Sequence, residues 1–260
     1  MDWSSPIVSG FLGSLVAGLG TGLGALPIFV RGGWSNNTQR LMLALAGGMM
    51  LGATFFSLLE PALGLVDASG GSKLAAVVTV GVGLILGAVV LWGLHALVPH
   101  EHFSKGREGS SAFELGRNAM FVVAIALHNF PEGLSVGVAF GAGASSTGAA
   151  VMLGIAAQNL PEGLAIAAAL VSDGVSRGRA FGIALLTGLV EPIGGLVGAA
   201  TVSASEVLLP WGLAFAAGAM LFVVSGEVLP ETHVEGGERS ATFAVVIGFV
   251  ATMALAVLLG

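Results

Sequence analysis

The sequence predicts an all-α polytopic membrane protein, a bundle of eight transmembrane helices. Of its 260 residues, 55% are hydrophobic and 9% are charged, whereas a soluble domain carries roughly 25% charged residues. The apolar residues form long runs, and a transmembrane helix needs about 20 of them. Transmembrane β-strands would alternate in segments of about 10 residues, and these runs do not. The composition therefore excludes a soluble enzyme, a nucleic-acid-binding protein and a disordered chain.

The eight predicted spans belong to one transmembrane domain, residues 1–260. They lie at about 7–30, 41–66, 74–98, 119–142, 147–171, 179–204, 207–229 and 241–259, with a polar loop at about 99–118. Asp2 stands where a signal peptide would carry a basic residue, so we interpret the first run as a retained span.

The basic residues predict the orientation. Eight of the nine Lys and Arg residues lie in alternate loops, and only Lys73 lies on the other side. The positive-inside rule then puts both termini outside the cytoplasm and the 99–118 loop inside it. We expect a multi-pass protein of the plasma membrane, which is the inner membrane in a bacterium. The glycine-rich spans let helices pack closely and are compatible with a homodimer.

Ionisable and amide side chains occur at mid-depth in three consecutive spans, where such groups are costly and indicate a site or a pathway. They are His128, Asn129 and Glu132, then Gln158, Asn159 and Glu162, and finally Glu191. Residues four apart share a helix face, so the fourth and fifth spans each present a chelating pair. Three carboxylates cannot all stay ionised in a dry interior without a counter-charge. Since no Lys or Arg lies at this depth, the positive charge must come from a metal ion or from protons.

The fourth and fifth spans carry two copies of one motif. His128–Leu134 reads HNFPEGL, and Gln158–Leu164 reads QNLPEGL. Adjacent spans run in opposite directions, so the copies form an inverted pair, as in many transporters. Pro131 and Pro161 each remove a backbone hydrogen bond, which is tolerated at this depth beside a cavity or under protein cover. A purely structural alternative takes the prolines as ordinary kinks and the amides as helix contacts, but it leaves the glutamates unexplained.

With these motifs the chain resembles the ZIP (Zrt-, Irt-like protein) family of divalent metal transporters, in particular a compact bacterial member. The resemblance covers nearly the whole chain and is carried by HNFPEG, QNLPEG and the Glu191-Pro192 step. It implies two adjacent metal positions that share Glu132 and Glu162. The first also takes His128, Gln158 and Met50, and the second also takes Asn129, Asn159 and Glu191. Without the resemblance, Met50 is interpreted as a packing residue.

Asn159 departs from relatives that carry an acidic residue at this place. The neutral amide removes one charge, so the second position is expected to bind more weakly. Three carboxylates and two divalent ions leave a surplus of positive charge, which argues against tight double occupancy.

A second group of metal-ligating residues is predicted on the cytoplasmic side. It comprises His95, His100, Glu101 and His102, with Glu227, Glu231 and His233 after the seventh span. Neutral imidazoles and carboxylates suit a weak, labile site that receives released metal. The alternative is a solvated loop with incidental histidines.

The expected function is uptake of Zn²⁺ into the cytoplasm by alternating access, with no enzymatic activity. The same donors also accept Cd²⁺, Fe²⁺, Mn²⁺ and Ni²⁺. The alternative is a proton-coupled carrier of another solute that uses the same carboxylates. An intramembrane metalloprotease would need two His residues at i and i+4 with Glu after the first, but Asn129 follows His128.

Overall fold

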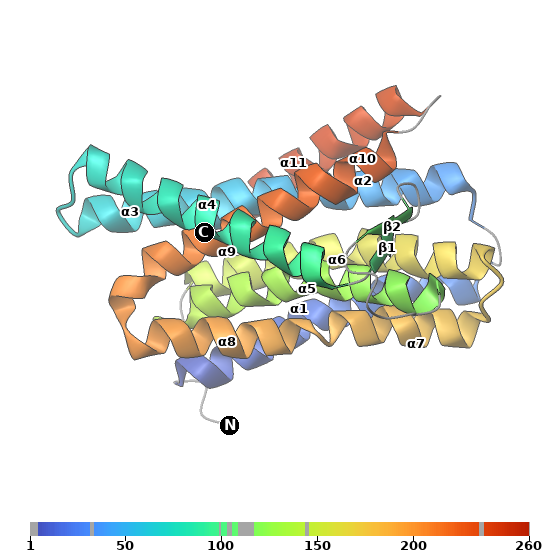
Figure 1. Ribbon diagram of the computed structural model, residues 1–260, viewed down its shortest axis with the longest axis horizontal. Helices are drawn as coiled ribbons and strands as arrows, with labels where there is room; N and C mark the ends of the chain where they lie inside the picture. Colours follow the sequence, from blue (N-terminus) through green and yellow to red (C-terminus); the bar gives the residue numbers. More distant parts are fainter. Residues whose placement is uncertain are drawn as a thin grey trace.

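The computed structural model describes residues 5–31, 34–98, 100–102, 106–108, 117–143, 146–233 and 237–259. The described chain contains eight helical spans that are long and apolar enough to cross a membrane (Figure 1), so the predicted all-α fold class is confirmed. The first four spans are α1 (Pro6–Ala25) with η1 (Leu26–Phe29), α2 (Asn36–Gly52) with η2 (Ala53–Leu59) and α3 (Glu60–Ala68), α4 (Lys73–Leu97), and α5 (Arg117–Phe140). The others are α6 (Ser146–Ser172), α7 (Arg177–Gly188) with α8 (Glu191–Ala204), η3 (Glu206–Leu208) with α9 (Leu209–Val223), η4 (Val224–Val228) and α10 (Leu229–Thr232), and α11 (Glu238–Leu259).

Three spans are interrupted at membrane depth. The sixth span breaks between α7 and α8, so that Glu191 begins a new helix. Pro192 has no N–H to offer the Gly188 carbonyl four residues before it, and this favours the break. The second and seventh spans contain the π-helical segments η2 and η4, a geometry that is frequent at functional sites. By contrast, α5 and α6 continue as helices through Pro131 and Pro161.

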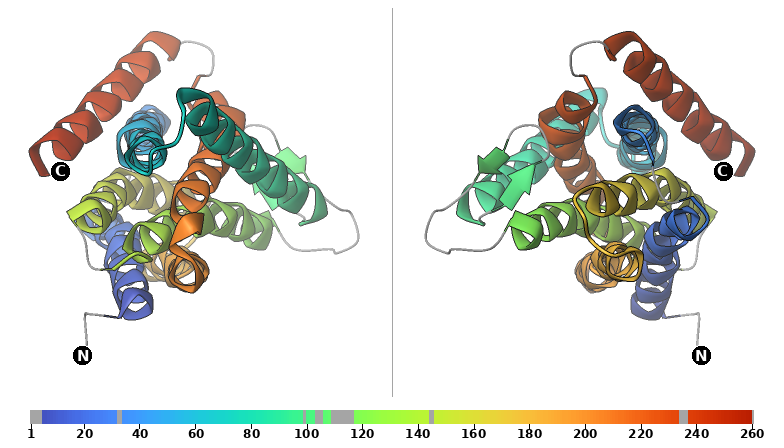
Figure 2. Two further views of the ribbon diagram at one scale, coloured as in Figure 1. Left: turned by 90° about the vertical axis from the view of Figure 1, so that its left-hand side faces the viewer. Right: turned by 90° about the vertical axis from the view of Figure 1, so that its right-hand side faces the viewer.

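A short β-hairpin lies within the predicted 99–118 loop. Strand β1 (His100–His102) pairs antiparallel with β2 (Gly106–Glu108), with His100 opposite Glu108. The hairpin contacts α5, beside which it is seen in the end-on views (Figure 2). The loop therefore contains a small ordered element, which the sequence analysis did not predict.

The helices form three closely packed groups. Helices α1, α5, α6, α7 and α8 pack against one another, while α2 pairs with α11 and α4 pairs with α9. Viewed along the bundle, α4 and α11 lie at its periphery (Figure 2). Helix α1 begins and α11 ends at the same end of the bundle (Figure 1).

Glycine contacts distinguish the interior of a group from the surfaces between groups. Added Cβ atoms on Gly18, Gly137 and Gly163 would collide with backbone carbonyls of neighbouring helices in the same group. Within the described chain, glycine-to-carbonyl contacts between helices all fall inside a group. Between groups, one buried apolar cluster joins side chains of α5 and α6 to side chains of α2 and α9, including Val136, Val138, Val151, Ile155, Met50, Leu213 and Met220. Backbones touch within groups, whereas side chains separate the groups.

Candidate metal centre

Helices α5, α6 and α8 bury the polar side chains that the sequence singled out. Side chains of five of these residues have no exposed surface: Asn129, Glu132, Gln158, Asn159 and Glu191. Glu162 is 5% exposed. All six lie inside the α1–α5–α6–α7–α8 group, where backbone-to-backbone packing holds their helices close together.

Amide groups hold two of the three carboxylates. The Gln158 amide nitrogen donates a hydrogen bond to Oε1 of Glu132 over 2.7 Å. The Asn159 amide nitrogen donates to Oε1 of Glu191 over 2.6 Å and to the Ala17 carbonyl over 2.8 Å. These bonds join α5 to α6, and α6 to α8 and α1. Side-chain amides are therefore used to orient acids from neighbouring helices.

The same six residues leave oxygen atoms without a hydrogen-bond partner among the described residues. These atoms are Asn129 Oδ1, Glu132 Oε2, Gln158 Oε1, Asn159 Oδ1, Glu162 Oε2 and Glu191 Oε2. A buried polar atom without a partner costs about 1–3 kcal/mol, and more when it is charged. The six oxygens all belong to residue types that coordinate metal ions. Together they form a set of possible metal ligands, called the donor set below, that suits a cation.

The three acids are close enough for their charges to interact. Glu132 interacts electrostatically with Glu162 and Glu191, and Glu162 interacts with His128. Mutual repulsion adds to the cost of removing each ionised carboxylate from water. A divalent cation between the helices would offset both the repulsion between the acids and the cost of removing them from water.

The two motif copies have equivalent backbone contacts. Gly133 of the first copy packs against the Glu191 carbonyl of α8, and Gly163 of the second packs against the Thr21 carbonyl of α1. A Cβ at either position would overlap these carbonyl groups. The glycine after each motif glutamate therefore lets a partner helix approach to backbone contact beside the acid.

His128 contacts Glu227, a residue that the sequence analysis placed in the cytoplasmic-side group. His128 Nε2 and Glu227 Oε2 are 2.6 Å apart, and the other Glu227 oxygen lies 2.5 Å from Nδ1 of His95. The two imidazole rings are stacked with their centroids 6.2 Å apart. Because His128 also interacts with Glu162, it links the acidic donor set to a buried His95–Glu227 pair.

The remaining residues of the cytoplasmic-side group differ in their surroundings. Glu231 is buried in α10 and interacts electrostatically with His128. His233 is exposed and hydrogen-bonds to Thr232, to the Leu229 carbonyl and to Thr242 of α11. His100, Glu101 and His102 form β1, but their side chains lie outside the described part of the chain. The sequence did not reveal that His95 and Glu227 meet His128, because the contact joins three distant helices.

Met50 is buried near the end of α2 at 2% exposure. It belongs to the apolar cluster between the helix groups, together with Ile155 and Val224. Its carbonyl accepts a hydrogen bond from the Thr54 hydroxyl at the start of η2. This position is compatible with a packing role of Met50 between the helix groups.

Within the described ranges, no three His, Asp or Glu side chains converge closely enough to hold a metal ion by themselves. In the described residues, acids and imidazoles alone therefore do not form a complete metal site. The amides of Asn129, Gln158 and Asn159 contribute three of the six free oxygens. A bound ion would draw on these amides or on small movements of the acids.

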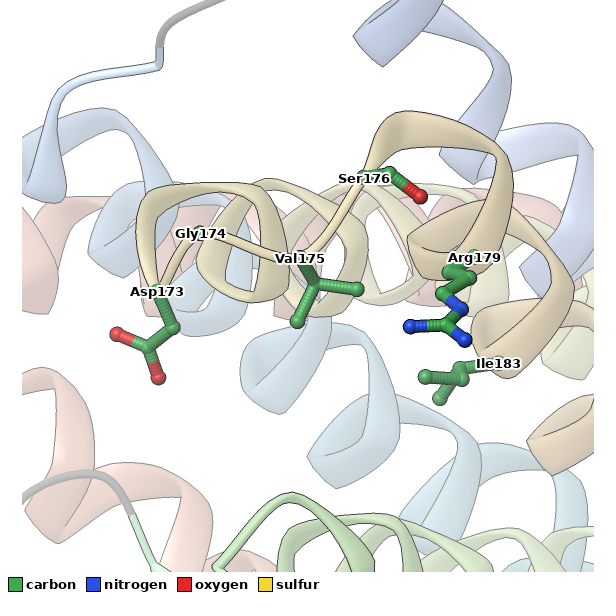
Figure 3. A pocket seen from close by; sticks show the side chains of 6 residues that line it. All are labelled: Asp173, Gly174, Val175, Ser176, Arg179 and Ile183. Atoms are coloured by element: carbon green, nitrogen blue, oxygen red, sulfur yellow. The ribbon is translucent and has the colours of Figure 1, made fainter.

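A pocket of about 510 Å³ opens at the α6–α7 turn and contains none of the predicted donors (Figure 3). It is lined by Asp173, Gly174, Val175, Ser176, Arg179 and Ile183. The Arg179 guanidinium lies beside Ile183, and Asp173 lies at the other end of the pocket (Figure 3). The turn lies at the end of the bundle that carries the basic loops, away from the motif residues.

Fold and site together define a class: a multi-pass membrane protein that encloses an acidic, amide-oriented donor set within a helical bundle. Comparison with known proteins is more specific. Residues 99–256 match the profile described as ZIP Zinc transporter, and the chain belongs to this family.

The similarity to individual relatives extends over nearly the full length. The zinc transporter GufA of Myxococcus xanthus is 48% identical over 252 residues, which cover 97% of this chain and 99% of the relative. The zinc transporter ZIPB of Bordetella bronchiseptica is 43% identical over 249 residues, covering 96% and 81%. The zinc transporter ZupT of Chlorobaculum parvum is 33% identical over 268 residues, covering 98% and 99%.

The buried charges predict how an isosteric amide affects stability. In Glu191→Gln, the Asn159 hydrogen bond can still form, and a buried charge is removed. With chelator at neutral pH, the variant should therefore melt at least as high as the wild-type chain. Added zinc should stabilise the wild type by about 2.7 kcal/mol at 100 times its Kd, and the variant by less.

Thermal unfolding in detergent measures both effects, with Glu206→Gln at an exposed helix end as the matched control. A lower melting temperature for Glu191→Gln in chelator, or an undiminished response to zinc, would contradict the interpretation.

Proposed function

We propose that the chain carries Zn²⁺ from the extracytoplasmic side into the cytoplasm through the donor set of α5, α6 and α8. The observation that carries the proposal is the set of six buried, partnerless oxygens on three helices. Carboxylate, amide and imidazole groups are ligands that zinc accepts. Relatives named zinc transporters over nearly the full length support the choice of zinc. Cd²⁺, Fe²⁺, Mn²⁺ and Ni²⁺ remain chemically acceptable to the same donors.

The proposed domain is the whole chain, with both termini outside and the 99–118 loop in the cytoplasm. The Lys and Arg asymmetry of the loops supports this orientation. Helix α1 begins and α11 ends at the same end of the bundle, which agrees with an even number of spans (Figure 1).

The donor set offers two adjacent positions. We propose that the first uses His128, Glu132, Gln158 and Glu162, with Met50 from α2. The second uses Asn129, Asn159 and Glu191, with Glu132 and Glu162 shared. Free oxygens in both motif copies support this proposal: the first copy contributes one amide and one carboxylate oxygen, and the second contributes two amide oxygens and one carboxylate oxygen.

We propose alternating access by movement of the α1–α5–α6–α7–α8 group against the other helices. Two kinds of interface support the proposal. Inside the group, glycines place backbone carbonyls in direct contact, and such an interface cannot slide without a collision. Towards α2 and α9, the contact consists of Val, Leu, Ile and Met side chains, which can repack as one surface moves over the other.

His128, Glu227 and His95 are the proposed route from the donor set towards the cytoplasm. His128 precedes Glu132 in α5, and His95 lies in the last turn of α4, before the predicted cytoplasmic loop. The two carboxylate oxygens of Glu227 each meet one of these histidines. A metal released from the first position would therefore find an imidazole and a carboxylate nearer to the cytoplasmic end.

Uptake of zinc into proteoliposomes tests the proposed site. Glu162→Ala should reduce uptake to that of empty liposomes, because it removes a carboxylate shared by both positions. Asp173→Asn, in the exposed pocket at the α6–α7 turn, is the matched control and should transport normally. Zinc uptake by Glu162→Ala at the wild-type rate would remove the donor set from the transport path.

The proposed exit route predicts that binding and transport can be separated. Glu227→Gln should bind zinc with nearly wild-type stoichiometry, but its uptake should be slower by about ten-fold, the lower end of effects seen when a group supporting a metal ligand is lost. Calorimetry in detergent measures binding, and proteoliposome uptake measures transport. Wild-type uptake by Glu227→Gln would contradict the route.

A further inference from the structure

We propose that Asn159 is a positioning residue whose amide fixes Glu191 against α1 in place of a second metal ion, so that the chain holds one divalent ion at a time. The inference rests on the metal site proposed above and specifies its occupancy.

The first argument is the geometry of one amide nitrogen. Asn159 Nδ2 donates to Glu191 Oε1 over 2.6 Å and to the Ala17 carbonyl over 2.8 Å. Asn159, Glu191 and Ala17 are all completely buried. Both partners are acceptors, so only the NH₂ side of the amide can face them. The carboxylate of an aspartate at position 159 has no proton to donate to either partner.

The second argument is that the hydrogen bond from Asn159 to the Ala17 carbonyl takes the place of a bond within α1, from the Thr21 hydroxyl to the same carbonyl. Other buried hydroxyls bond back to a carbonyl of the preceding turn, as Thr54 does to Met50 and, within α1 itself, Ser14 does to Gly10. The corresponding carbonyl for Thr21 is that of Ala17, which accepts from Asn159 instead. The Thr21 hydroxyl is fully buried and has no partner within the described residues. The contact from Asn159 therefore replaces the usual local bond of α1.

The third argument is the contrast with the other motif copy. Asn129 occupies the equivalent place, and both its amide nitrogen and its amide oxygen are without hydrogen-bond partners in the described chain. Only the second copy has its amide tied to an acid and to a neighbouring helix. The two hydrogen bonds of the Asn159 amide nitrogen are therefore particular to position 159 and are not shared by both copies of the motif.

The fourth argument is charge balance. Glu132, Glu162 and Glu191 carry three negative charges when ionised. One divalent ion leaves a single negative charge, and the amide donors of Gln158 and Asn159 stabilise it. Two divalent ions would leave one positive charge in excess over these three acids, and a buried unbalanced charge is unfavourable. The Glu227 carboxylate is already held by His128 and His95. An aspartate at position 159 would bring the acids to four charges, equal to two divalent ions.

The test is the number of zinc ions bound by the full-length chain in detergent. Protein stripped with chelator is titrated with zinc in a calorimeter, and bound metal is then counted by elemental analysis after desalting. We expect one ion for the wild type and two for Asn159→Asp. Thr21→Val, which removes a hydroxyl without a partner among the described residues, is the matched control and should bind one.

Each outcome decides the matter. Two ions in the wild type, or one ion in folded Asn159→Asp, would overturn the inference while leaving the transport site intact. If Asn159→Asp does not fold, the stoichiometry of the wild type still decides. No bound zinc in the wild type would instead refute the metal site itself. Gain of an ion by Asn159→Asp alone supports the inference, because a loss of packing cannot create a binding position.

Discussion

The structure depends on burying three carboxylates from three helices, in spans whose middle parts contain no lysine or arginine. Glu132 and Glu191 are fully buried and Glu162 nearly so. Such groups are tolerated only when hydrogen bonds, together with a cation or protonation, offset the loss of water. The amides of Gln158 and Asn159 supply hydrogen bonds to Glu132 and Glu191. Oxygens of the three acids that have no partner in the described chain mark where a cation or a proton would balance the charge.

Close packing brings the acids within reach of one another. Gly133 and Gly163 let α8 and α1 approach the two motif helices to backbone contact. Glycines keep α1, α5, α6, α7 and α8 together, whereas bulkier side chains separate this group from α2 and α9. The same division that assembles the donors thus defines the surface along which we propose the group to move. In this respect the assembly of the buried acids and the movement that we propose depend on one feature of the sequence, the placement of its glycines.

Much of this organisation could be predicted from the sequence. Eight apolar runs are visible because a span needs about 20 apolar residues. The donor residues stand out because acids and amides are rare at mid-span. The motif repeat also identifies the α5–α6 pair. These are local signals, each readable within one helix.

Other features depend on contacts between distant segments and were not predictable. The break between α7 and α8 is hidden within one apolar run, although Pro192 marks it. Glu227 joins His128 because η4 buries it against α4 and α5, whereas its position after an apolar run suggested the cytoplasmic loop. The bond from Asn159 to the Ala17 carbonyl links residues 142 positions apart. The spacing of residues along one helix does not reveal which residues of distant helices it will contact.

Zinc K-edge X-ray absorption on the purified chain, loaded with one equivalent of zinc, tests most directly whether a dication balances the buried acids. The account predicts oxygen and nitrogen ligands at about 2.0–2.2 Å, with scattering from an imidazole and from the Met50 sulfur. It also predicts the loss of this spectrum in a Glu132→Ala, Glu162→Ala double variant. A spectrum of fully hydrated zinc, or one that is unchanged in the double variant, would contradict it.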